Sequence, residues 1–191
     1  MEPIDLFGVA RELQDFCDGQ RWNSCFIGGI AVQRWSQARV TRDVDLTLLT
    51  GFGDEVRYIE ELLAKFEPRI DDAAAFALRN RVLLLMSSSG VGIDISLGAL
   101  PFEHLVVKRA SLYEFAPDLA LRTCSAEDLM VMKLFAFRGI DLRDAEGIAV
   151  RHGNMLNWRY VEEQLVPLAE AKEDPEILNE FKRIRSLSST L

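Results

Sequence analysis

Residues 41–48 read TRDVDLTL, and from Asp43 onward polar and apolar side chains alternate. Successive side chains of a β-strand point to opposite faces of the sheet. The alternation therefore predicts a strand with Asp43 and Asp45 on one face and three aliphatic side chains on the other. Two carboxylates so close together repel each other unless cations neutralise them, and magnesium is the simplest cation to expect.

The segment upstream predicts a phosphate-binding turn. Residues 24–35 read SCFIGGIAVQRW, a short apolar strand, the pair Gly28-Gly29 and a segment with helical spacing. Glycines let backbone amides approach a phosphate closely, and a helix N-terminus adds a partial charge of about +0.5. We expect a triphosphate at Gly28 and Gly29, although the pair alone is also typical of an ordinary strand-to-helix turn.

A third carboxylate lies downstream, in a predicted hairpin. Residues 82–86, VLLLM, resemble a buried strand, residues 87–90 supply a turn, and residues 91–97, VGIDISL, alternate again with Asp94 as the acidic member. Three carboxylates on neighbouring strands can hold two magnesium ions about 3.5–4 Å apart, the arrangement used for in-line phosphoryl or nucleotidyl displacement. A D-x-D pair alone is more often a solvated acidic face, so the hypothesis depends on the glycine turn and on Asp94.

The remaining periodicities predict the architecture. We expect an α+β (mixed α/β) fold in which helices flank a mixed sheet, followed by a helical subdomain. The predicted domains are residues 1–123, the core, and residues 124–191, packed on it. Helices are predicted at 4–16, 55–66, 71–80, 101–110, 126–137, 142–151, 160–171 and 175–184, and two further strands at 112–115 and 119–123.

Lys133 stands out within this helical part. Residues 129–137 are apolar on nearly all sides, so its ammonium needs an anionic partner or a route to solvent. The acidic site could supply that partner, contact with a nucleotide is the role that we expect, and extension to the surface is the alternative. Asp141 and Asp144 follow Gly139, and we interpret them as a helix N-cap with a stabilising acid in the first turn.

Composition excludes several function classes. The net charge of −8 and pI near 4.9 argue against an extended surface for duplex DNA, and no apolar run approaches the roughly 18 residues of a membrane span. The acidic N-terminal sequence does not resemble a signal peptide, and three scattered cysteines, Cys17, Cys25 and Cys124, fit buried thiols in the cytoplasm. With His104 and His152 as the two histidines, a zinc site would need an unusual ligand set.

The glycine pair, residues 41–46 (TRDVDL) and residues 92–95 (GIDI) resemble the polymerase-β-type nucleotidyltransferase superfamily in order and spacing. Further along, residues 127–147 resemble its AbiEii-like, toxin-type branch through the positions of Lys133, Arg138 and the segment 141–147. Gly29 departs from the superfamily, which often has serine there.

The resemblance implies a set of roles. Asp43 and Asp45 would ligate two magnesium ions, and Asp94 would ligate the catalytic ion and help to activate the attacking hydroxyl. Lys133 would join Gly28 and Gly29 in contacting the phosphates of a nucleoside triphosphate such as ATP.

We therefore expect an enzyme that moves a nucleoside monophosphate from a triphosphate to a hydroxyl of transfer RNA or other RNA, a protein or a small molecule such as an aminoglycoside. A toxin–antitoxin or resistance setting, and an antitoxin partner, follow from the resemblance. The alternative is a catalytically silent protein of the same fold that binds a protein partner, and nucleotide binding separates the two.

Overall fold

The structure is a computed structural model of the chain and describes residues 5–188. It divides into two compact units. The first comprises the residues up to Ile30 together with Val40–Cys124, and the second comprises Ala31–Arg39 together with the residues from Ser125 onward. Ile4, which we predicted at the start of the first helix, lies outside the described residues.

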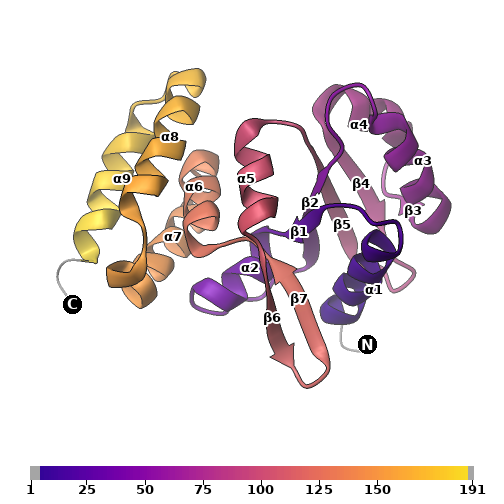
Figure 1. Ribbon diagram of the computed structural model, residues 1–191, viewed down its shortest axis with the longest axis horizontal. Coiled ribbons are helices and arrows are strands. Elements are labelled where there is room, and N and C mark those ends of the chain that lie inside the picture. The colour runs from indigo at the N-terminus through magenta and orange to yellow at the C-terminus, as the bar shows by residue number, and fades with distance from the viewer. Residues whose placement is uncertain (1–4, 189–191) are drawn as a thin grey trace. The chain divides into compact units, whose positions relative to one another are not determined.

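A mixed sheet forms the centre of the first unit (Figure 1). Its seven strands within the described residues run in the order β3-β4-β5-β2-β1-β7-β6. Strand β2 lies between β1, which is antiparallel to it, and β5, which is parallel. The strands are β1 (Ser24–Phe26), β2 (Asp43–Leu49), β3 (Glu67–Pro68), β4 (Val82–Met86), β5 (Gly92–Gly98), β6 (Ser111–Ala116) and β7 (Leu119–Thr123).

The aliphatic faces of β2 and β5 join a hydrophobic core. Val44 and Ile93 are fully buried and belong to one cluster with Leu13 and Leu62. The helices of this unit are α1 (Leu6–Gly19), the first turn of α2 (Gly28–Trp35), α3 (Glu55–Lys65), α4 (Ala73–Asn80) and α5 (Pro101–Arg109). Because the core takes up one face of β2 and β5, their aspartates project from the other.

The second unit is helical. Its core contains Leu134, Ile148, Leu165 and Phe181, all buried. Its elements are the rest of α2, α6 (Ala126–Ala136), α7 (Gly139–His152), the short 3-10 turn η1 (Gly153–Met155), α8 (Trp158–Lys172) and α9 (Glu176–Leu187). Across the part of the chain that is described, none of the helices combines the length and apolar character that crossing a membrane requires.

The predicted fold class is confirmed, as are the strand at residues 43–48 and the hairpin that carries Asp94. Strand β3 was not predicted, because two residues carry no periodic pattern. Helix α2 begins at the glycines themselves rather than at Ile30. Helix α7 begins at Gly139, three residues before the predicted start, a shift that changes the interpretation of Asp141 below.

Candidate active site

The parallel pairing of β2 with β5 brings the predicted carboxylates together. Asp45 lies opposite Asp94, and Asp43 lies opposite Gly92. Paired residues of neighbouring strands point to the same face, and the strands are about 4.8 Å apart. The neighbours Val44 and Ile93 are fully buried, whereas the three aspartates are partly or fully exposed. The sheet therefore presents all three carboxylates on one accessible face.

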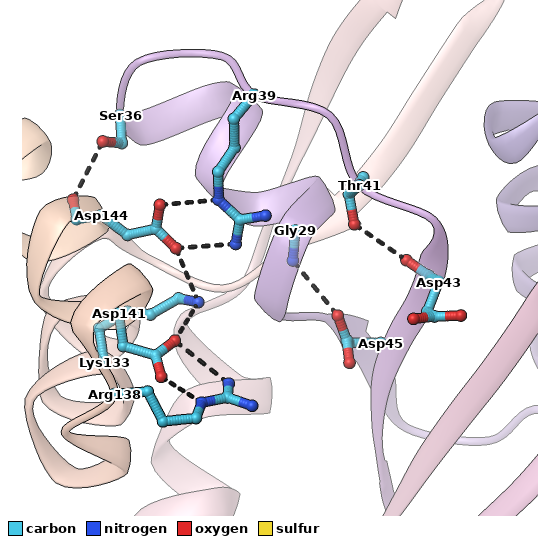
Figure 2. Close-up of polar contacts among 10 residues, drawn as sticks. All are labelled: Gly29, Ser36, Arg39, Thr41, Asp43, Asp45, Lys133, Arg138, Asp141 and Asp144. Atoms are coloured by element: carbon cyan, nitrogen blue, oxygen red, sulfur yellow. Dashed lines mark hydrogen bonds and ion pairs between the residues drawn. The ribbon is translucent and has the colours of Figure 1, made fainter.

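The two glycines allow helix α2 to begin directly against β2. Gly28 has a positive φ of 52°, a conformation that glycine adopts without strain, and a Cβ at this position would overlap the carboxylate of Asp45. The Gly29 amide donates a hydrogen bond to Asp45 Oδ2 at 3.3 Å (Figure 2). A Cβ at Gly29 would overlap the side chain of Thr41. Side chains at both positions would push the helix N-terminus away from the carboxylates.

Arg69 is the member of this site that sequence reasoning missed. It follows β3, and its backbone amide donates to Leu84 O at 3.0 Å, while Leu84 is paired with Asp94. Its guanidinium places Nη2 2.6 Å from Asp94 Oδ1 and Nη1 3.9 Å from Asp43 Oδ1. A cation supplied from the edge of the sheet thus lies beside two of the three carboxylates.

The environment of Asp94 perturbs the pKa of its carboxyl. Burial raises the pKa of its carboxyl, the ion pair with Arg69 opposes the rise, and the charge of Asp43 adds to it. Its Oδ1 is buried and accepts no well-aligned hydrogen bond, although Arg69 lies beside it as an ion-pair partner. A buried carboxylate oxygen of this kind is stabilised by a further cation.

The donor set fits a magnesium ion in type and register, since carboxylate oxygens are its preferred protein ligands. The present side-chain orientations do not enclose an ion: within residues 5–188 no three acidic, histidine or cysteine side chains converge on one point. Asp94 and Asp43 face Arg69, and Asp45 faces the Gly29 amide. Metal binding would require the carboxylates to turn from these partners.

A second charged cluster lies within the helical unit (Figure 2). Lys133 Nζ is 2.8 Å from Asp141 Oδ1 and 2.9 Å from Asp144 Oδ2. Arg138 also donates to Asp141, and Arg39 donates to both oxygens of Asp144 at 2.9 Å. The Lys133 side chain is 7% exposed, so its extension to the surface is excluded. Its anionic partners are these two aspartates.

The N-cap interpretation of Asp141 is wrong. The N-cap residue of α7 is Arg138, and Asp141 is the third residue of the helix, where it is buried. Burial alone would raise the pKa values of Asp141 and Asp144, but hydrogen bonds from Arg138 and Lys133 to the first, and from Arg39 and Lys133 to the second, lower both. Both carboxylates are therefore held ionised inside the helical unit.

The sequence matches the protein-family model described as "Nucleotidyl transferase AbiEii toxin, Type IV TA system" over residues 13–152. A search of curated proteins finds no significant match. An antigenic nucleotidyltransferase-like protein from Paracoccidioides brasiliensis has a similar fold, with a TM-score of 0.53 and 15% identity over 93% of this chain and 92% of that one.

Two further solved structures align with lower TM-scores. The antibiotic-resistance factor ANT(2'')-Ia aligns with a TM-score of 0.47 and 14% identity, over 96% of this chain and 91% of that one. JHP933 from Helicobacter pylori aligns with a TM-score of 0.48 and 13% identity, over 98% and 94% of the two chains.

The family match extends over well more than half of the sequence, and the chain therefore belongs to the AbiEii nucleotidyltransferase toxin family and is a nucleotidyltransferase enzyme.

Proposed function

We propose that the enzyme transfers a nucleoside monophosphate from a nucleoside triphosphate to a hydroxyl group, with magnesium held by Asp43, Asp45 and Asp94. The observation that carries this proposal is the register of β2 and β5, which places Asp45 beside Asp94 on a face that adjoins the Gly28-Gly29 turn. Family membership supports the reaction class. Magnesium, when bound, would neutralise phosphate charge and favour in-line displacement.

In the proposed reaction, the acceptor oxygen forms a bond to the α-phosphorus while the bond to the pyrophosphate oxygen breaks and pyrophosphate leaves. We assign the hydroxyl proton to the carboxylate of Asp94. The pKa of Asp94 is raised by burial, and basicity increases with pKa, so its carboxylate is suited to accept this proton.

The Gly28-Gly29 turn is the proposed phosphate site. Helix α2 begins there, and backbone amides at a helix N-terminus bind anions. The Gly29 amide now donates to Asp45, so a phosphate would replace that carboxylate oxygen as acceptor when Asp45 turns to its ion.

Lys133 is the remaining predicted phosphate contact. An ammonium has three N–H donors, and two of those on Lys133 point to Asp141 and Asp144, which leaves one for a phosphate oxygen. Titration of nucleotide into Lys133→Met tests this role: weaker binding by a variant that is less stable but still folded supports it, and unchanged affinity contradicts it.

The proposed acceptor is a hydroxyl of RNA, of a protein or of a small molecule. Because the family comprises toxins of type IV toxin–antitoxin systems, we infer that an antitoxin counteracts this activity. We place the reaction in the cytoplasm, since all three cysteines are buried thiols, as is usual in a reducing compartment.

The experiment is a transfer assay with triphosphates labelled on the α-phosphate or on the γ-phosphate, offered separately with transfer RNA, total protein and aminoglycosides. Nucleotidyl transfer labels the acceptor from the α-phosphate alone and requires magnesium. An Asp43→Asn, Asp45→Asn double variant should be inactive, whereas Asp15→Asn, which changes an exposed carboxylate of the same unit, should remain active. Transfer of label from the γ-phosphate would instead indicate a kinase. If no acceptor becomes labelled and the protein binds no nucleotide, the protein is the catalytically silent, partner-binding alternative.

A further inference from the structure

We propose that Arg69 is a built-in counter-ion that occupies the cation position between Asp43 and Asp94, and that a divalent ion must displace its guanidinium to bind. This inference rests on the proposed magnesium site. To that site it adds Arg69, which follows β3 at the edge of the sheet and whose charge sets the affinity of the carboxylates for metal.

The strand order places Arg69 in line with the site. The Arg69 amide bonds to Leu84, Leu84 pairs with Asp94, and Asp94 pairs with Asp45, so four neighbouring segments form one row across the sheet. Paired side chains share a face. Arg69 can therefore reach across Leu84 to Asp94, and the 2.6 Å ion pair shows that it does.

Gly92 provides the space in which the guanidinium meets Asp43. A Cβ built on Gly92 would collide with both Asp43 Oδ1 and Arg69 Nη1, so the two groups converge above a position that has no side chain. Nη1 and Oδ1 are 3.9 Å apart there. The guanidinium thus occupies the gap between two of the three proposed metal ligands.

A guanidinium and a divalent ion that approach the same carboxylate oxygens compete for them, because the two positive charges repel each other and occupy the same space. Asp94 Oδ1, the atom that Arg69 approaches, is also the buried oxygen that lacks a well-aligned hydrogen bond. The pair is only partly buried, with Arg69 26% and Asp94 33% exposed, so water can take up the released guanidinium. Displacement therefore exchanges a monovalent for a divalent counter-ion without leaving a buried charge unpaired.

A solvent-open hollow next to Arg69 can receive its guanidinium after displacement. Arg69 lines this hollow of about 840 Å³ together with Leu63, Pro68, Ile70 and the start of α4. The hollow is open to solvent, so a guanidinium that leaves the carboxylates can turn toward it while the backbone bond to Leu84 holds Arg69 in the sheet.

The first test is titration of Mn²⁺ alone, followed by electron paramagnetic resonance, into the wild type, Arg69→Gln, Arg69→Lys and Arg79→Gln. Arg79 is an exposed arginine of α4 in the same unit and serves as the matched control. We expect Arg69→Gln to bind Mn²⁺ about tenfold more tightly than wild type, because a competing charge a few ångströms away has been removed. Arg79→Gln should match the wild type, and Arg69→Lys should lie between wild type and Arg69→Gln.

The second test uses the wild type, so it does not depend on a variant that folds. The guanidinium resonances of Arg69, assigned by their loss in Arg69→Gln or by sequential assignment, should shift to those of a solvated arginine as Mg²⁺ is added. Guanidinium resonances that stay unchanged at saturating Mg²⁺ overturn the proposal.

The two proposals fail in different ways. If the wild type binds Mn²⁺ and Arg69→Gln binds it no more tightly, the role of Arg69 is wrong and the metal site stands. If neither protein binds Mn²⁺, the metal site itself is wrong and the counter-ion proposal falls with it.

Discussion

The cluster of Asp43, Asp94 and Arg69 and the cluster of Lys133, Asp141 and Asp144 both pair carboxylates with cations, but they differ in how exposed the carboxylates are. In the sheet unit, Asp43 and Asp94 share one guanidinium, that of Arg69, on an accessible face. In the helical unit, Asp141 and Asp144 share Lys133, and each also binds an arginine of its own. The carboxylates of the first cluster are partly or fully exposed and outnumber its cation, whereas both carboxylates of the second are buried and each pairs with two cations.

The difference separates a binding site from a structural element. A partly exposed group of carboxylates with too little positive charge gains stability when a cation binds. A buried cluster in which each carboxylate pairs with two cations loses much stability when one member is removed. Variants should therefore impair chemistry in the first cluster and folding in the second.

The largest expected effect is on activity in Asp94→Asn. Loss of a proposed metal ligand and proton acceptor should lower nucleotidyl transfer about 1,000-fold, at the upper end of what removal of one charge-stabilising group costs. The thermal midpoint should stay similar or rise, because repulsion among the carboxylates decreases. Parallel transfer assays and thermal melts check this, with Asp15→Asn as the control; full activity in Asp94→Asn would remove the residue from the site.

The second effect is on stability in Asp141→Asn. The side chain of Asp141 is 1% exposed, so its neutralisation leaves the buried Lys133 with a weaker partner and should cost about 3 kcal/mol of unfolding free energy. Urea denaturation measures this cost, with Glu163→Gln as an exposed control in the same unit. A variant as stable as wild type would mean that the cluster is not structural, and would strengthen a direct role for Lys133 at the nucleotide.

A smaller effect is expected for Gly28→Ala. The positive φ of Gly28 costs a non-glycine residue about 1–2 kcal/mol, and the added methyl would displace the Asp45 carboxylate. The variant should lose both stability and magnesium-dependent nucleotide binding. Gly19→Ala, at a position with open space around it, is the control. Unchanged nucleotide binding in Gly28→Ala would separate the glycine turn from the phosphate site.

The smallest effect concerns pH. The folded pKa values of Asp141 and Asp144 are lowered, so the unfolded chain binds protons first as the pH falls. Their contribution to stability is present above the unfolded value of about 3.9 and is lost as the pH falls through the folded values. Urea denaturation from about pH 6 to about pH 3 should show this loss in wild type and a shallower one in the Asp141→Asn, Asp144→Asn double variant. If the unfolding free energy falls equally steeply with pH in the two proteins, Asp141 and Asp144 are not the groups responsible for the loss of stability.

The sequence predicted those parts of the fold and site that depend on local pattern. Alternation located β2 and β5 and assigned Asp43, Asp45 and Asp94 to a polar face, because the side-chain period of a strand is fixed. Arg69 could not be predicted in this way. Its contact with Asp94 depends on the strand order β3-β4-β5, and β3 is two residues long.

The partners of Lys133 were present in the sequence but were misinterpreted. Asp141 lies eight residues after Lys133, on the next helix, and a helix start at Asp141 appeared natural because aspartate is a common N-cap. Helix α7 instead begins at Gly139, which turns Asp141 inward to meet the buried ammonium. Tertiary pairing of a buried charge outweighed local capping preference.

The most direct test is calorimetric titration of each nucleoside triphosphate, with magnesium, into the wild type and the Asp43→Asn, Asp45→Asn double variant. If the accessible carboxylates of β2 and β5 form the nucleotide site, the wild type will bind at least one triphosphate in a magnesium-dependent manner and the double variant will not. Equal binding to both proteins would contradict that assignment.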